Sequence, residues 1–247
     1  MALLETEALI LRTYNLAEAD KIVVCLTRSH GLIRGVAKGC RKLRNRFGAS
    51  LEPFTLINLT YYAKENQELV SFRQTEILRS HFNLSSDASI LTGLAYIGDL
   101  LVEFSPPHQA NETLFRMTTA CLDAISTVPT ELQTVLRYFE VWLLKIEGFL
   151  PDLKSCAECH RAFGEESVYM APDLGLRCSD CREGRSAALS KRLHAHLRTV
   201  ERLPPVKFAE QAREINNQTK REMAELTHQL IGRVLERAPR LRPTFAQ

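Results

Sequence analysis

The pattern of apolar and polar residues changes its period near residue 80. Before that point the two classes alternate in short segments rich in β-branched and aromatic residues, as is typical of strands that bury one face. Breakers such as Ala17–Asp20 and His30-Gly31 separate these segments. The pattern predicts five strands, at residues 8–14, 21–27, 32–37, 53–62 and 69–77. Five short strands at this spacing suit a small barrel of the OB type.

After residue 80 the apolar residues recur every three to four positions, which indicates helices. Four residues at the starts of these runs can act as N-caps: Asp87, Asn111, Thr130 and Ser190. Thr130 also begins the capping-box signature Thr-Glu-Leu-Gln. Pro204-Pro205 should end the fourth helix, and a last helix is expected over residues 210–237. His194 and His196 lie two residues apart on the fourth helix, so we interpret them as surface or boundary residues rather than ligands of one metal.

Two pairs of cysteines interrupt the helical region. Cys156-Ala-Glu-Cys159 and Cys178-Ser-Asp-Cys181 are separated by 18 residues, a spacing typical of four-cysteine zinc sites. Each pair can grip a metal ion from a tight turn, and two pairs complete a tetrahedron. Four protein ligands leave no open position for water, so the sequence predicts one structural Zn²⁺ per chain rather than a catalytic metal.

Two alternatives exist for these cysteines. Disulfide bonds would suit a secreted chain. The sequence Cys156-Ala-Glu-Cys159-His160 also matches the haem-attachment motif C-x-x-C-H. Haem attachment would require export and would leave the second cysteine pair without a role, so we favour zinc.

These patterns predict an α+β fold. An N-terminal five-stranded OB-type β-barrel is followed by a helical domain that contains an inserted four-cysteine zinc module. The expected boundaries are a nucleic-acid-binding barrel at 1–80, a first helical part at 81–152, the zinc module at 153–184 and a second helical part at 185–247.

Charge is distributed unevenly along the chain. The net charge of the 247 residues is +3, yet residues 1–80 contain 12 Lys or Arg against 8 Asp or Glu, and the remainder contains 20 against 21. No apolar run approaches the ~20 residues that span a bilayer. The N-terminus has no basic segment of the kind that begins a signal peptide. We therefore expect a cytoplasmic protein without a membrane partner.

The excess positive charge concentrates between the third and fourth predicted strands. Residues 34–47, from the third predicted strand into the following connection, contain no acidic residue and six basic ones: Arg34, Lys38, Arg41, Lys42, Arg44 and Arg46. OB barrels commonly bind nucleic acid with a basic groove that follows the phosphates and aromatic rings that stack on bases. Phe47, Tyr61 and Tyr62 are the nearby candidates for stacking, although each aromatic taken singly is more typical of a core residue. The alternative for the basic residues is a solvated loop that only aids solubility. We favour nucleic-acid binding.

Motifs of catalysis are missing from the sequence. It contains no Walker phosphate loop, no G-x-G-x-x-G, no H-E-x-x-H and no G-x-S-x-G. Cys25 and Cys121 have the apolar surroundings of buried residues, and Cys40 lacks an obvious base. We predict that the protein is not an enzyme.

Seven segments occur in a fixed order along the chain: Glu7–Tyr14, Glu18–Asp20, Thr27–Gly31, Gly35–Gly39, Arg46-Phe47, Leu51–Phe54, and Gly148–Asp152 just ahead of the first cysteine pair. Together they resemble the RecO family of bacterial DNA repair proteins, and the resemblance covers roughly residues 6–181. One departure is Ala17 and Ala19, because relatives often have Gly-Glu-Ser-Asp in this turn, and the difference concerns the geometry of the turn.

This resemblance implies a recombination mediator. Such a protein would bind single- and double-stranded DNA, anneal complementary strands, and act with RecR to load RecA onto DNA coated by single-stranded-DNA-binding protein. It would also contact the tail of that coating protein and associate with the nucleoid in the cytoplasm. The alternatives are a zinc-containing OB-fold protein associated with RNA or the ribosome, since an OB barrel does not by itself choose DNA, and a protein-interaction scaffold whose basic loop binds an acidic partner.

Overall fold

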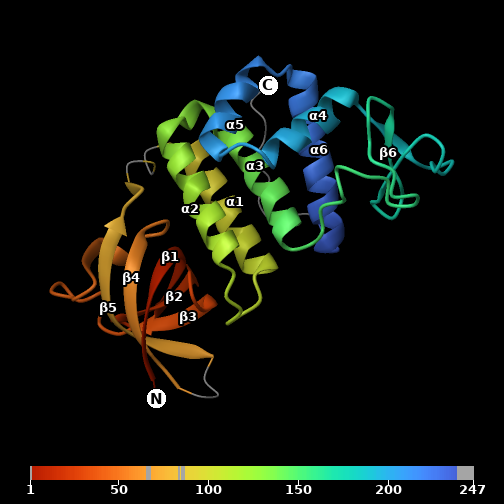
Figure 1. Cartoon of the computed structure of the whole chain (residues 1–247). Coiled ribbons are helices and arrows are strands. Elements are labelled where there is room, and N and C mark those ends of the chain that lie inside the picture. Colours follow the sequence, from red (N-terminus) through yellow and green to blue (C-terminus); the bar gives the residue numbers. More distant parts are fainter. Residues whose placement is uncertain (1, 65–67, 83, 85–86, 238–247) are drawn as a thin grey trace. The chain divides into compact units, whose positions relative to one another are not determined.

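The computed structural model describes the chain except for residues 1, 65–67, 83, 85–86 and 238–247 (Figure 1). The described residues form two compact units: the first ends at Ser126 and the second begins at Thr127. This division falls inside the segment that we expected to be the first helical part. None of the described helices is long and apolar enough to cross a membrane.

Five strands form the N-terminal part of the first unit (Figure 1). Their order is β1-β2-β3-β5-β4, and β4 also pairs with β1, so each strand has two neighbours and the barrel is closed. The β3–β5 pair is parallel, whereas the other pairs are antiparallel. The predicted five strands and the N-terminal OB-type sheet are therefore confirmed. The bounds are β1 Ala2–Leu16, β2 Asp20–Thr27, β3 Gly31–Ala37, β4 Leu56–Ala63 and β5 Leu69–Arg79.

The barrel interior is filled by the alternate apolar residues of the strands. Ile10, Val23, Ile33, Ile57 and Phe72 are among its fully buried members. Residues from outside the strands complete this core, because Phe47 and Leu51, at the 3-10 turn η1 (Gly48–Leu51), pack into it. Gly35 is required by this packing, since a Cβ at that position would lie 2.1 Å from the Phe72 ring.

Two helices complete the described part of the first unit, α1 (Ala88–Phe104) and α2 (Glu112–Thr127). The predicted caps are confirmed: the Asp87 carboxylate accepts hydrogen bonds from the N–H groups of Ser89 and Ile90, and Asn111 Oδ1 accepts one from Leu114. Ion pairs connect the helices to the barrel. These pairs are Arg12–Asp99, Arg28–Glu112 and Arg79–Asp123.

The second unit contains four α-helices among its described residues. They are α3 (Leu132–Ile146), α4 (Lys191–Val200), α5 (Pro205–Gln211) and α6 (Asn217–Val234), and α3 contacts each of the others. Ser190 caps α4 as predicted. The predicted capping box at Thr130 is wrong, because Pro129 begins the 3-10 turn η3 (Pro129–Glu131) and α3 starts without a side-chain cap.

The predicted last helix over residues 210–237 is present as α6, but it begins later than predicted. Pro204-Pro205 ends one helix and begins another, because proline is well suited to the first helical turn. A short 3-10 turn, η4 (Ala212–Glu214), then separates α5 from α6, and Asn216 caps α6 by accepting a hydrogen bond from the N–H of Thr219. Residues 238–247 of the expected 185–247 segment lie outside the described residues.

Polar side chains are buried between the helices of the second unit. Glu140 on α3 is fully buried and forms an ion pair with Arg137, with 2.8 Å between Oε1 and Nη2. Thr227 on α6 donates a hydrogen bond to the other carboxylate oxygen, and His228 Nε2 lies 2.9 Å from Arg137 Nη1. This network joins α3 to α6 in the core.

The two histidines of α4 are also buried, which corrects our interpretation of them as surface or boundary residues. His194 Nε2 lies 2.8 Å from the carbonyl oxygen of Leu153, and the His196 ring stacks on Phe208 with 4.8 Å between centroids. Both therefore act as core residues of the second unit.

The segment between α3 and α4 contains a three-stranded sheet of order β7-β6-β8. Its short strands are β6 (Val168–Met170), β7 (Leu176–Arg177) and β8 (Ala187–Leu189). Since β8 pairs with β6, the sheet continues past residue 184, where we had placed the end of the cysteine module.

Candidate metal centre and nucleic-acid interface

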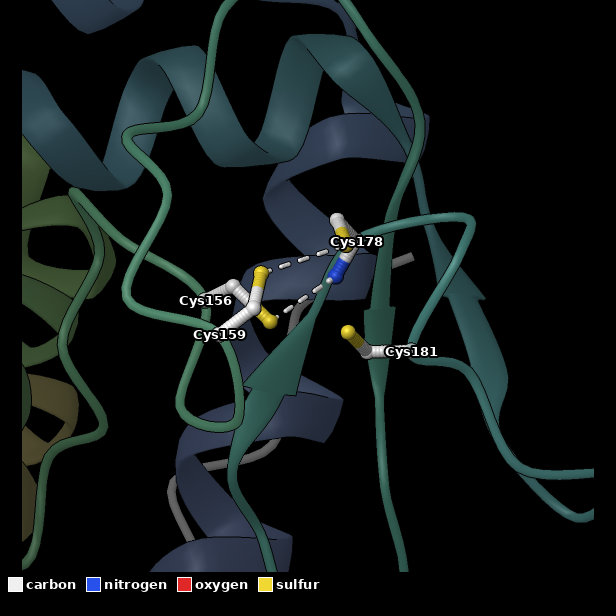
Figure 2. Close-up of side chains that lie close together, drawn as sticks. All are labelled: Cys156, Cys159, Cys178 and Cys181. Carbon is white, nitrogen blue, oxygen red and sulfur yellow. Dashed lines mark hydrogen bonds between the residues drawn. The ribbon is translucent and has the colours of Figure 1, made fainter.

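The four paired cysteines converge at one point in the second unit (Figure 2). The sulfur atoms of Cys156, Cys159, Cys178 and Cys181 all lie within 4.8 Å of one another, and those of Cys159 and Cys178 are 3.9 Å apart. In a tetrahedral site with metal–sulfur bonds of about 2.3 Å, sulfur atoms are about 3.8 Å apart. The arrangement is therefore close to that of a four-thiolate metal site.

Tight turns bring each cysteine pair together. The N–H of His160 donates to the carbonyl oxygen of Cys156, and the N–H of Cys181 donates to that of Cys178. The two turns are joined by the N–H of Cys178, which lies 3.5 Å from the sulfur of Cys156, and by the N–H of Ala157, which donates to Leu176. These bonds thus place the two turns so that the four cysteines surround one point.

The electrostatics of the cluster favour a bound cation. Burial alone would raise the pKa of the Cys156 thiol, but N–H groups of Cys159, Cys178 and Glu158 donate to its sulfur and lower this pKa to about 6. Hydrogen bonds with Cys159 and Cys178 instead raise the pKa of Cys181 to about 12. Four adjacent sulfurs cannot all be thiolates without a compensating charge. A divalent metal would supply it in place of the protons.

The donor set fits a structural metal better than the other two interpretations. All seven cysteines lie in the described residues and all are free, so none of the suggested disulfides is present. Haem attachment would use only the first pair, whereas the structure brings both pairs to one point. Four sulfur donors suit zinc or iron, and they leave no position for a substrate.

The cysteine module is attached to the helices of its unit. Besides the His194–Leu153 contact, the rings of Phe163 and His194 pack at right angles to each other with 5.6 Å between their centroids. Arg233 of α6 donates a hydrogen bond to the carbonyl oxygen of Pro172 at 2.6 Å. A metal at the four cysteines would therefore stabilise a module that packs against α4 and α6.

The second candidate site is the basic segment of the first unit. We call residues 38–46, between β3 and η1, the basic loop. All six predicted cations are exposed, and none forms an ion pair with a carboxylate of the described residues. Arg34 lies on β3, and the other five lie in the basic loop: Lys38, Arg41, Lys42, Arg44 and Arg46.

Hydrogen bonds hold the basic loop against the rest of the barrel. The Asp20 carboxylate accepts a bond from the N–H of Gly39 at 2.7 Å, and the N–H of Arg41 donates to Ala19 at 3.0 Å. At the other end of the loop, Asn45 Oδ1 accepts bonds from the N–H groups of Phe47 and Gly48. The cations are therefore presented by an anchored loop. Sequence reasoning did not identify Asn45 or Asp20 as its supports, although both residue types favour such turns.

The structure corrects two of the three predicted stacking residues. Phe47 and Tyr61 are 3% and 2% exposed and belong to the barrel core, so their rings cannot lie against a base. Tyr62 is half-buried, and the Arg73 guanidinium lies 5.7 Å from its ring centroid. The alternation along β4 explains the difference, since neighbouring residues point to opposite faces. Arg73 is an exposed cation that sequence reasoning missed.

The remaining cysteines do not form a catalytic site. Burial raises the pKa of Cys25 and of Cys121, and both are fully buried. Burial is also the main cause that raises the pKa of the half-buried Cys40. None of the three has the lowered pKa of an activated nucleophile.

Comparisons with known proteins connect both sites to one family. The family model described as "Recombination protein O N terminal" matches residues 1–81, and the model described as "Recombination protein O C terminal" matches residues 85–243. The two matches meet just after the barrel, and the second includes all four clustered cysteines.

Individual relatives agree over most of the chain. A protein of Koribacter versatilis is 32% identical over 83% of each chain. One of Symbiobacterium thermophilum is 32% identical over 82% of this chain and 80% of its own, and one of Dehalococcoides mccartyi is 31% identical over 72% and 70%. All three are named "DNA repair protein RecO". The chain therefore belongs to the RecO family, whose role lies in DNA repair and recombination and which consists of mediators rather than enzymes.

Proposed function

We propose that the protein is a recombination mediator that binds single- and double-stranded DNA through the basic loop and anneals complementary strands. One observation carries the proposal: six exposed cations without carboxylate partners among the described residues lie on and beside an anchored loop of an OB-type barrel. Family membership favours DNA over the RNA- or ribosome-associated alternative.

The proposed mechanism is electrostatic. Arg34, Lys38, Arg41, Lys42, Arg44 and Arg46 would neutralise phosphates and release the counterions that surround a nucleic acid. Neutralising two strands at once lowers their mutual repulsion, which is the physical basis of annealing. Tyr62 and Arg73, on the outer face of β4 and β5, are the pair left to contact a base or a phosphate beside the loop.

The finer parts of the role rest on family membership. RecR would be the partner with which the protein loads RecA onto DNA coated by single-stranded-DNA-binding protein, and the tail of that coating protein would dock on the chain. We place this work in the cytoplasm, at the nucleoid. We also keep as a proposal the division into an OB domain, two helical parts and a cysteine module.

We further propose that the ion at Cys156, Cys159, Cys178 and Cys181 is Zn²⁺, one per chain. The cluster of four free sulfurs supports this assignment, because zinc accepts a closed tetrahedron of thiolates without redox chemistry. When bound, the metal would crosslink the two turns that contain the cysteine pairs. It takes no part in DNA chemistry.

The dependence of DNA affinity on salt tests the mechanism. A plot of log affinity against log salt has a negative slope for a single strand. Replacing Arg41, Lys42, Arg44 and Arg46 with Ala should make this slope shallower by about 0.7 for each phosphate that the variant no longer neutralises. A matched control replaces Lys154 and Lys207, two exposed cations of the second unit that form ion pairs. Their removal should leave the slope unchanged. An unaltered slope in the loop variant would show that the basic loop is not the main DNA contact.

A further inference from the structure

The tip of the basic loop carries a large apolar side chain that nothing covers. Leu43 is 103% exposed, whereas the next most exposed large hydrophobic residue among those described, Phe82, is 72% exposed. Single apolar residues on a surface are common and need no special role. Leu43 differs from such residues because it is completely exposed in the middle of a cationic loop, and three further observations indicate a role for it.

The first observation is that the main chain around Leu43 is held. The N–H of Lys42 donates to Gly39 at 3.1 Å, and the side-chain amide of Asn45 donates to the carbonyl oxygen of Lys42, also at 3.1 Å. The second bond spans Leu43 and Arg44. The side chain of Leu43 is therefore held out from a closed turn.

The second observation concerns charge. Lys42 and Arg44 flank Leu43 directly, and Arg41 and Arg46 lie beyond them. All four are exposed, and none is neutralised by a carboxylate of the described residues. A polyanion attracted to this loop would bring its phosphates to both sides of Leu43.

The third observation is one of scale. The two residues from Lys42 to Arg44 would span at most about 7 Å if extended and span less in this turn, a length between one and two of the ~3.4 Å steps of stacked bases along one strand. Neighbouring phosphates held by these two cations would leave room between their bases for one apolar side chain. Apolar residues of DNA-binding proteins insert between bases in this manner and unstack them.

We propose that Leu43 inserts between two neighbouring bases of a bound single strand and keeps that step unstacked. This inference rests on the proposed function, since it requires DNA on the basic loop. An unstacked step presents the pairing edges of its bases apart from one another, which would help a complementary strand to find them. The residue thus adds a base contact to a loop that otherwise contacts phosphates.

A fluorescent adenine analogue that stacking quenches gives a direct test. The full chain, a Leu43→Ala variant and a Leu69→Ala control are each added at saturation to a single strand that contains the analogue. Leu69 is also an exposed leucine, but it lies on β5 outside the loop. The wild type and the control should raise the fluorescence, and Leu43→Ala should not. Since the side chain is uncovered, this substitution should leave the melting temperature unchanged.

Salt dependence separates this inference from the proposed function. Leu43→Ala keeps every charge, so it should weaken binding by at most about a hundredfold at an unchanged salt slope. Equal fluorescence in Leu43→Ala and wild type, together with a shallower slope in the loop-charge variant, would overturn the insertion alone. An unchanged slope in the loop-charge variant would overturn DNA binding by the loop itself. The same measurement is made with the analogue in a duplex, and a rise with the duplex but not with the single strand would overturn the assignment to single strands.

Discussion

Glu140 offers the sharpest test of how the second unit is held together. Its side chain is fully buried, and Arg137 beside it is only 2% exposed. Glu140→Gln keeps the shape and the hydrogen bond from Thr227 but removes the negative charge. The buried Arg137 guanidinium would then lose the negative charge 2.8 Å from its Nη2, while His228 Nε2 stays 2.9 Å from its Nη1.

The expected effect is large. Removing one partner of a buried ion pair costs about 3–5 kcal/mol. With a urea dependence of about 2 kcal/mol per molar, the midpoint of unfolding should fall by about 1.5–2.5 M. Trp142 is the single tryptophan of the chain and lies on α3, where its indole N–H donates to the carbonyl oxygen of Val200 on α4. Tryptophan fluorescence therefore reports on unfolding of this unit.

Two further variants isolate the cause of the effect. Glu225→Gln, at an exposed position on α6, makes the same chemical change without burial and should alter the free energy of unfolding by less than about 0.5 kcal/mol. Replacing both partners with apolar residues, as Arg137→Met with Glu140→Leu, should be less destabilising than Glu140→Gln alone, because neither charge of the pair is then buried without the other. A midpoint for Glu140→Gln equal to that of Glu225→Gln would refute the reasoning.

Three other predictions concern the barrel turn, the metal and pH. Ala17 has a φ of +54°, so Ala17→Gly should stabilise the first unit by about 1 kcal/mol in chemical denaturation; a loss of stability would contradict this. Metal analysis should give one zinc per chain, and Cys159→Ser should lower the melting temperature while DNA binding in the cold is kept; a metal-free protein of full stability would exclude the site. Burial, aided by the charge of Lys220, lowers the pKa of His196 from 6.5 to about 4. The folded state therefore resists protonation of this imidazole, and up to about 3 kcal/mol of stability present above pH 6.5 should be lost as the pH falls toward 4. His196→Phe should flatten that pH dependence, and an equally steep profile in the variant would assign it to other groups.

The sequence was sufficient to predict features that depend on residues only a few positions apart. The alternation along β4 and the caps at Asp87, Asn111 and Ser190 are confirmed, because each involves groups a few residues apart. The cysteine spacing likewise identified four sulfurs that meet in space.

Elements that depend on distant partners were not predictable. Residues 2–7 extend β1 because they pair with β4, more than fifty positions away. The short strands β6, β7 and β8 have too few residues to show a period. Burial of His194 depends on Leu153 and Phe163 in the cysteine module, which no local pattern reveals. Burial of the Phe47 ring likewise depends on the distant strands that it packs against, whereas the alternation along β4 already placed Tyr61 on the same face as Ile57 and Leu59.

Several of the segments that resemble the RecO family lie next to one another at the basic loop. Glu18–Asp20 and Gly35–Gly39 are far apart along the chain, yet the Asp20 carboxylate accepts the hydrogen bond from Gly39, and the carbonyl of Ala19 holds Arg41. Phe47, next to the last cation of the loop, is buried in the barrel core. These segments therefore build the support that presents the cations. An alanine with positive φ in the supporting turn, as at Ala17, leaves this support formed, because the carbonyl groups of Ala17 and Ala19 both still accept hydrogen bonds from Arg41.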